Sequence, residues 1–117
     1  MFNTLVLVGR VVEKPEKINL ETGQKMAILK LAVQRAFKNH KGEYDVDFFN
    51  ILLWEGLTEA ACEYCTKGSV VGVKGRIQVR TTDLVVKEET LKINNVEVIG
   101  EKIHFIHLIK EKEDGEK

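Results

Sequence analysis

The most constraining feature of the chain is residues 27–54, AILKLAVQRAFKNHKGEYDVDFFNILLW, which read as two long β-strands joined by a polar, basic connection. Successive side chains of a strand point to opposite faces, so residue parity assigns each side chain to a face. The odd-numbered residues of the second strand are uniformly apolar and suit a core: Phe49, Ile51 and Leu53. The even-numbered residues form an aromatic face broken by one amide: Phe48, Asn50, Leu52 and Trp54. We therefore expect this second face to meet something other than bulk water.

The first strand of the pair divides in the same way. Its odd-numbered residues are predicted to point inward, and its even-numbered residues form a mixed outer face. The inward set is Leu29, Leu31 and Val33, and the outward set is Ile28, Lys30, Ala32 and Gln34. The strand runs to Phe37, beyond which residues 38–42 read as an exposed hairpin loop with a basic bias. An aromatic face beside a basic loop leads to the hypothesis that the face meets unpaired nucleic-acid bases.

Length and composition set limits on what the chain can be. Its 117 residues are most simply one domain, and 44% hydrophobic with 31% charged residues is typical of a soluble globular protein. No apolar run approaches the roughly 20 residues of a membrane helix, and the start lacks the basic region of a secretory signal. We therefore expect a cytoplasmic protein without a membrane partner.

The charge balance is neutral overall but uneven along the chain. Residues 1–80 hold 12 Lys/Arg against 9 Asp/Glu, and residues 81–117 hold 6 against 9. A net charge of zero argues against nucleic-acid binding by bulk electrostatics. A mildly basic body with an acidic end is compatible with local nucleic-acid contacts.

The remaining elements are predicted in this order: a strand at residues 4–12, a short helix at 57–66, a strand at 69–80, a hairpin tip at 87–90, strands at 91–99 and 103–109, and a disordered polar tail at 110–117. Gly9 predicts a bulge or bend in the first strand. Gly68 suits the left-handed position after the helix, and Gly100 is expected to end a strand.

Three strands, one helix and two or three further strands follow the order of an OB-fold. This fold is all-β with one short helix, a five-stranded Greek-key barrel, and we expect it to span residues 1–109 as one domain. The competing class is an α+β sandwich with one helix packed across an open sheet. Glycines that suit a tightly curved sheet favour the barrel.

Two cysteines form a C-x-x-C pattern, Cys62 and Cys65, which can indicate a redox or zinc site. No further cysteine is present, and His104 and His107 fall on opposite faces of a strand, so no metal site is predicted. The apolar positions of the helix follow the spacing of one helix face, and Cys65 lies on that face as a core residue. No catalytic set or phosphate-cradling loop is found, so we expect neither an enzyme nor a cofactor.

Four segments carry a resemblance to a known family: TLVLVGRVVEKPE, LAVQRAFKN, DFFNILLWEGLTEAACEYCTKGSVVGVKGRIQVR and VEVIGEKIHFI. In order and spacing the chain resembles the bacterial single-stranded DNA-binding proteins over residues 1–109. The resemblance implies a homotetramer that wraps single-stranded DNA without catalysis and serves replication, recombination and repair. It places the stacking aromatics of the family on Phe37, Phe48 and Trp54, a mode of binding known for such proteins. The fourth aromatic position falls at about Thr82, which cannot stack.

Basic residues near these positions are the candidate phosphate ligands, although each alone could be an ordinary solvated charge. They are Arg35, Lys38, Lys41, Lys67, Arg76 and Arg80. The family also ends in an acidic tip with a terminal aromatic that recruits replication and repair proteins. This sequence ends at Gly115-Glu116-Lys117 without that tip, as expected of a tail-less member or of a truncated chain.

One alternative function remains open at this point. A replication-accessory OB protein of the primosomal type would use the same fold chiefly for protein contacts. Thr82, the neutral net charge and the acidic pair Glu88-Glu89 are compatible with it. A cytoplasmic, nucleoid-associated protein is expected in either case. The sequence leaves open the size of the binding site and the preference between DNA and RNA.

Overall fold

The fold was analysed in a computed structural model, which describes residues 1–110. Its elements are β1 (Leu5–Val11), β2 (Ile18–Asn19), β3 (Lys25–Lys38), β4 (Tyr44–Trp54), α1 (Gly56–Tyr64), β5 (Val70–Val86) and β6 (Glu89–His107). The predicted tail lies outside the described residues except for Lys110. No helix within residues 1–110 is long and apolar enough to cross a membrane.

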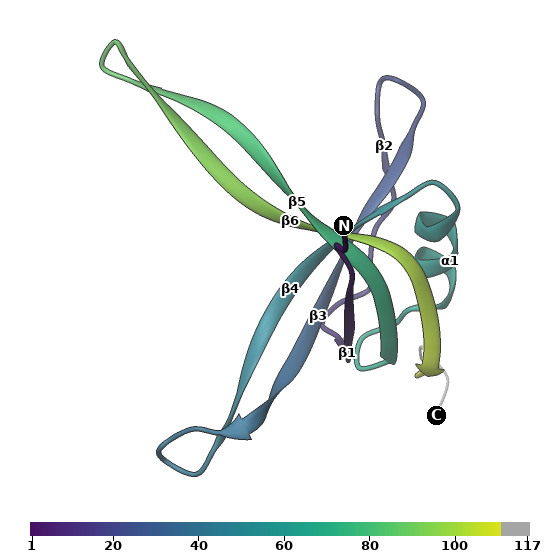
Figure 1. The fold of residues 1–117 in the computed structure, drawn as a ribbon. Helices are drawn as coiled ribbons and strands as arrows, with labels where there is room; N and C mark the ends of the chain where they lie inside the picture. Colours follow the sequence, from purple (N-terminus) through teal and green to yellow (C-terminus); the bar gives the residue numbers. More distant parts are fainter. Residues whose placement is uncertain (111–117) are drawn as a thin grey trace.

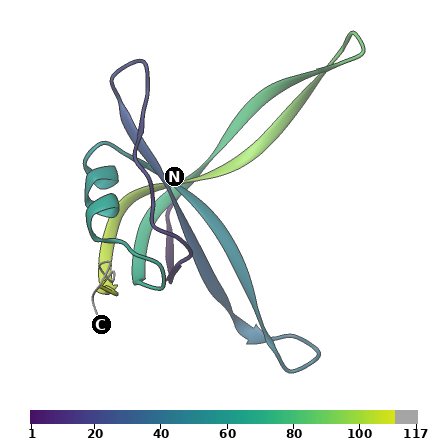
Figure 2. The same ribbon diagram turned by 180° about the vertical axis from the view of Figure 1, so that it is seen from behind.

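The strands close into a barrel. The sheet has the order β1-β5-β6-β4-β3-β2, and β1 also pairs with β3, so that five strands form a ring with β2 outside it. The contact between β4 and β6 is parallel, and the other pairings are antiparallel. This is the predicted OB-fold. Two long hairpins, β3–β4 and β5–β6, extend from the barrel in different directions, and α1 lies beside it (Figures 1 and 2).

The barrel interior follows the predicted parity. Four large side chains of β3 and β4 are fully buried, and Val33 and Phe49 pack against them: Leu29, Leu31, Ile51 and Leu53. Val71 and Val73 of β5 complete the core from the opposite wall. Each such aliphatic side chain contributes about 1.5–3 kcal/mol by leaving water. Burying one face of β3 and β4 in this way leaves the even-numbered face outside.

Two glycines permit the strands to approach closely where the barrel closes. A Cβ atom at Gly9 would collide with the carbonyl oxygen of Ala32, and one at Gly75 with that of Ile99. Gly9 lies directly before Arg10, which pairs with both β5 and β3, so β1 changes its pairing partner here. The expected bend at Gly9 is therefore a site of close backbone contact.

The predicted ends of the helix and of the strands in the β5–β6 hairpin are wrong. The strand predicted at 69–80 runs from Val70 to Val86. The helix ends at Tyr64, because Cys65 is already extended, and Gly68 (φ 88°) instead forms a turn in which the Ser69 N–H donates to the Thr66 carbonyl over 3.0 Å. The strands predicted at 91–99 and 103–109 are one continuous β6. Gly100 does not end β6. It pairs with Gly75 of β5, the register shifts between Lys74 and Gly75, and the pairing of the two strands continues on both sides of this shift.

The cysteines are free thiols, and Cys65 is a core residue as predicted. Burial raises the pKa of the Cys65 thiol to about 11, and the nearby Cys62 adds to the shift. Tyr64 is 48% exposed, and its ring lies edge-on to Phe105 at 5.5 Å between centroids. Within residues 1–110 no group of three or more His, Cys, Asp or Glu residues could hold a metal ion.

Candidate nucleic-acid interface

The pairing of β3 with β4 sets the even-numbered residues side by side on the outside of the barrel. The cross-strand pairs are Ala32 with Phe48, Lys30 with Asn50, Ile28 with Leu52 and Met26 with Trp54. We call this surface the platform. Phe48 is 72% exposed on it, and Trp54 is partly exposed at its other end. Because the opposite faces of the same strands fill the core, these two rings are held on a rigid support.

Phe37 lies near the end of β3, beyond an irregularity in the ladder between Gln34 and Lys38. Its ring is 86% exposed. The irregularity means that parity along β3 does not fix the face of Phe37, whereas it does fix that of Phe48. Phe37 therefore lies on the same hairpin as Phe48 and Trp54 but towards its tip, one residue before β3 ends.

The tip of the β3–β4 hairpin is organised by a residue that the sequence analysis did not single out. The Asn39 side-chain oxygen accepts hydrogen bonds from the backbone N–H groups of Lys41 (2.9 Å) and Glu43 (3.0 Å), and its amide donates to Asp45 (3.1 Å). Asparagine is favoured in such turns because its side chain bonds its own backbone. The loop that carries the basic residues therefore has a fixed backbone.

Three of the six predicted phosphate ligands are engaged with carboxylates. Arg35 donates two hydrogen bonds to Asp47, of 2.9 and 3.0 Å, and its guanidinium also lies 3.8 Å from Asp45. The hydrogen bond and the charge of Arg35 lower the pKa of Asp47, and the same contacts raise the pKa of Arg35. Arg35 is thus the partner of a carboxylate on the neighbouring strand.

The arginines of β5 are paired in a similar way. Arg80 Nε lies 2.9 Å from an oxygen of Glu97, whose side chain is only 13% exposed. That oxygen is buried and accepts no hydrogen bond of good geometry, so the contact is an ion pair without a hydrogen bond. Arg76 Nε lies 3.8 Å from Glu101, and Arg76 also donates to Gln78 over 2.7 Å.

The other three predicted phosphate ligands are lysines. Lys38 Nζ lies 5.7 Å from the centre of the Tyr44 ring, a cation–π contact. Lys38, Lys41 and Lys67 have no carboxylate partner among residues 1–110. Lys38 and Lys41 lie at the tip of the β3–β4 hairpin, whereas Lys67 lies in the turn between α1 and β5. The structure therefore sets two of these lysines at the hairpin tip beyond Phe37 and the third apart from them.

Thr82 lies in the last part of β5, towards the hairpin tip and opposite Ile93 of β6. Its neighbours on the same hairpin face are Leu84 and Leu91, which pair with each other. These aliphatic side chains are 40–51% exposed: Leu84, Leu91 and Ile93. No aromatic residue is present from residue 77 to residue 98. The β5–β6 hairpin thus has exposed apolar surface but no ring on which a base could stack.

Comparison with known proteins places the chain in a family. Residues 2–106 match the model of the single-strand binding protein family. Single-stranded DNA-binding protein B of Bacillus subtilis is 40% identical over 106 residues, which cover 91% of each chain. The single-stranded DNA-binding protein of Halalkalibacterium halodurans is 39% identical, over 91% of this chain and 61% of its own length.

A solved structure agrees with the fold. The wild-type single-stranded DNA binding protein from Thermus aquaticus matches with a TM-score of 0.75 over 91% of this chain and 50% of that one. At 22% identity this likeness supports the barrel rather than any residue role. The family model and the Bacillus relative carry the assignment, and the chain belongs to the single-strand binding protein family.

Proposed function

We propose that this protein binds single-stranded DNA, with little dependence on sequence and without catalysis, and so protects unpaired strands during replication, recombination and repair. Family membership supports this function. The observation that carries it is the placement of Phe48 and Phe37, 72% and 86% exposed, on the hairpin that also holds Trp54. Rings this exposed cost free energy in water unless they meet a partner, and every base has a face on which an aromatic ring can stack.

The proposed mechanism has a base part and a phosphate part. Bases stack on Phe37, Phe48 and Trp54, each contributing about 1–3 kcal/mol. Lys38 and Lys41 contact phosphates at the hairpin tip directly, because no carboxylate of residues 1–110 pairs with them. The remaining proposed phosphate ligands are Lys67, Arg35, Arg76 and Arg80. The three arginines must exchange a carboxylate partner for phosphate, so they add less net affinity.

We also propose that the protein acts as a homotetramer in the bacterial cytoplasm, associated with the nucleoid. Two apolar patches support self-association. One lies on β1 and β6, with Val6, Val8 and Ile106 at 66%, 52% and 58% exposed, and the other at the base of the β5–β6 hairpin, with Val79 and Val96 at 61% and 67%. A tetramer with two kinds of two-fold axis needs two such self-complementary surfaces. Sedimentation of a monomer at micromolar concentration would contradict this assembly.

The binding function is tested by titrating the protein with oligo-dT while following Trp54 emission and the anisotropy of labelled DNA. We expect quenching of Trp54 fluorescence and tight binding at low salt. The logarithm of the association constant should fall linearly with the logarithm of the salt concentration. Duplex DNA of the same length is the matched control and should compete weakly. Unchanged emission and anisotropy at low salt would contradict the proposal. The comparisons give no support to the alternative, a primosomal-type accessory protein acting mainly through protein contacts.

A further inference from the structure

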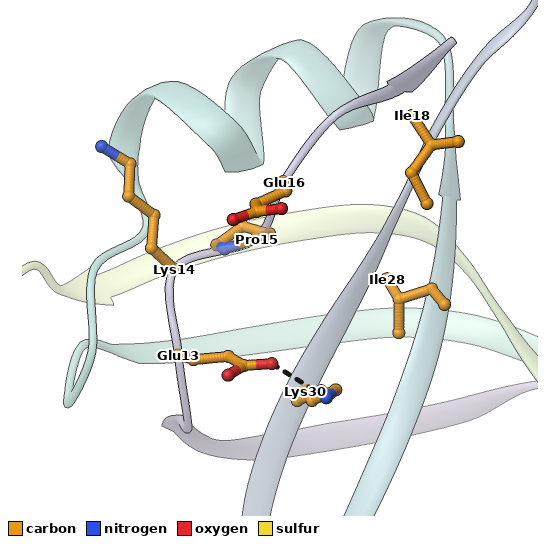
Figure 3. Close-up of a pocket in the computed structure, with 7 residues that line it drawn as sticks. All are labelled: Glu13, Lys14, Pro15, Glu16, Ile18, Ile28 and Lys30. Carbon is orange, nitrogen blue, oxygen red and sulfur yellow. Dashed lines mark ion pairs between the residues drawn. The ribbon is translucent and has the colours of Figure 1, made fainter.

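A hollow of about 250 Å³ adjoins the platform (Figure 3). Five of its lining residues come from β2 and the segment before it, and two from β3: Glu13, Lys14, Pro15, Glu16, Ile18, Ile28 and Lys30. At roughly 30 Å³ for each water molecule, the volume equals about eight waters. One nucleobase has about as many heavy atoms as the hollow has room for waters, so the hollow suits a single base.

The hollow continues the platform. Ile28 pairs with Leu52 and Lys30 with Asn50 across β3 and β4, and Ile18 of β2 pairs with Met26, the partner of Trp54. Ile28 and Lys30 therefore share the outer face on which Phe48 and Trp54 lie. A single strand that runs over Phe48 and Trp54 meets this hollow at the β2 side of the platform.

The lining divides into an apolar side and a polar side. Ile18 and Ile28 are 43% and 37% exposed and offer an aliphatic surface against which a base ring can lie. In the view of Figure 3, the Glu13 and Glu16 carboxylates lie across from these two isoleucines. A base that lies against the isoleucines therefore directs its edge towards the carboxylates.

The carboxylates are acceptors only. Glu13 lies 2.8 Å from Lys30 Nζ, and the hydrogen bond and charge of Lys30 lower the pKa of Glu13, so it is ionised at neutral pH. Glu16 has no hydrogen-bond or ion-pair partner among residues 1–110. An ionised carboxylate can accept a hydrogen bond from the exocyclic amine of cytosine or adenine. Thymine presents a carbonyl oxygen at the same position of its edge, which a carboxylate repels.

We propose that this hollow is a base subsite that prefers a base with an exocyclic amine, cytosine or adenine, over thymine, through Glu16 and Glu13. The inference rests on the proposed binding of single-stranded DNA and adds a local base preference to it. Stacking on the platform stays independent of sequence, and the preference arises at this one position.

The test compares dissociation constants of oligo-dC, oligo-dA and oligo-dT of equal length for the full chain and for the double variant Glu13→Gln with Glu16→Gln. Removing two negative charges tightens all three complexes, so the readout is the ratio of dT to dC affinity, in which this common effect cancels. We expect the variant to shift this ratio towards dT by about fivefold, the lower end of what a side-chain contact to a base edge discriminates. The matched control is Glu21→Gln with Glu43→Gln, which removes equal charge outside the hollow.

A second measurement uses the unmodified protein, so that it does not depend on a variant that folds. Oligo-dC with N4,N4-dimethylcytosine has no amine hydrogens, and we expect it to bind more weakly than unmodified oligo-dC. Equal dC-to-dT ratios in the protein and the double variant, or unchanged affinity for the methylated DNA, would overturn the subsite while leaving single-strand binding intact. Failure to bind any of the three unmodified oligonucleotides would instead reject the proposed function itself.

Discussion

The two long hairpins of the barrel differ in the chemistry that they expose. The β3–β4 hairpin carries exposed Phe37 and Phe48, Trp54 at its base, and two lysines at its tip that pair with no carboxylate of residues 1–110. The β5–β6 hairpin exposes aliphatic side chains, and its two arginines each lie next to a glutamate. We therefore expect the two hairpins to serve different purposes. We expect stacking energy to come from β3–β4, while β5–β6 contributes charge and apolar surface.

The largest expected effect tests whether the β3–β4 hairpin supplies the stacking energy. Phe48→Ala removes one exposed ring from the platform and should weaken oligo-dT binding by about 5- to 150-fold, the range for one stacked base. Ile93→Ala, which shortens an apolar side chain on the other hairpin, is the control and should change affinity little. Both are measured by the anisotropy of labelled DNA. Equal losses in the two variants would contradict the division between hairpins.

A gain of affinity tests whether the β5–β6 hairpin contacts DNA but lacks a ring for stacking. Thr82→Trp places a ring beside Ile93 on the hairpin face that holds Arg80, and it should tighten oligo-dT binding by about fivefold. Val85→Trp puts the same ring on the opposite face of the same hairpin, at an exposed position outside the proposed self-association patch, and serves as the matched control. An unchanged affinity of Thr82→Trp would show that DNA does not run along this hairpin.

Freeing the paired arginines should have a smaller effect. Asp47→Asn releases Arg35, and Glu97→Gln releases Arg80, so each variant should bind oligo-dT a few times more tightly at low salt. The salt slope of the logarithm of affinity should steepen by about 0.7 for each arginine that gains a phosphate. Steepening in Asp47→Asn alone would remove Arg80 from the phosphate contacts and confine binding to β3–β4. Steepening in neither would leave both arginines as structural partners of their carboxylates.

The smallest expected effect is on stability in acid. The pKa of Asp47 is lowered from its ordinary 3.8 by Arg35, so the pair stabilises the folded state above that value. Its contribution is lost as the pH falls through the depressed pKa of the folded state. Thermal unfolding measured from pH 5 to below pH 3 should therefore show a steeper loss for the unmodified chain than for Asp47→Asn. Parallel curves would mean that the Arg35–Asp47 contact does not stabilise the fold.

Residue parity predicted the core and the outer face of β3 and β4, because strand geometry is local and repeats every two residues. It could not predict that Arg35 meets Asp47, or that Arg80 meets Glu97. These contacts depend on which residues of neighbouring strands face each other, and that register is set by the whole barrel. The same reason explains Gly100: it reads as a strand end locally, but long pairing with β5 carries β6 past it. The two-residue strand β2 was missed because so short a segment has no periodicity to detect.

The most direct test of the division between the hairpins is photo-cross-linking to single-stranded DNA that contains 5-iodouracil, followed by mass spectrometry of the cross-linked peptides. We expect cross-links at Phe37, Phe48 and Trp54, all within β3, β4 and their loop. The Thr82→Trp variant gives the second hairpin an aromatic residue and checks that a cross-link there would be detected. Cross-links of the unmodified protein concentrated in residues 77–98, with none in residues 37–54, would contradict base stacking on the β3–β4 hairpin.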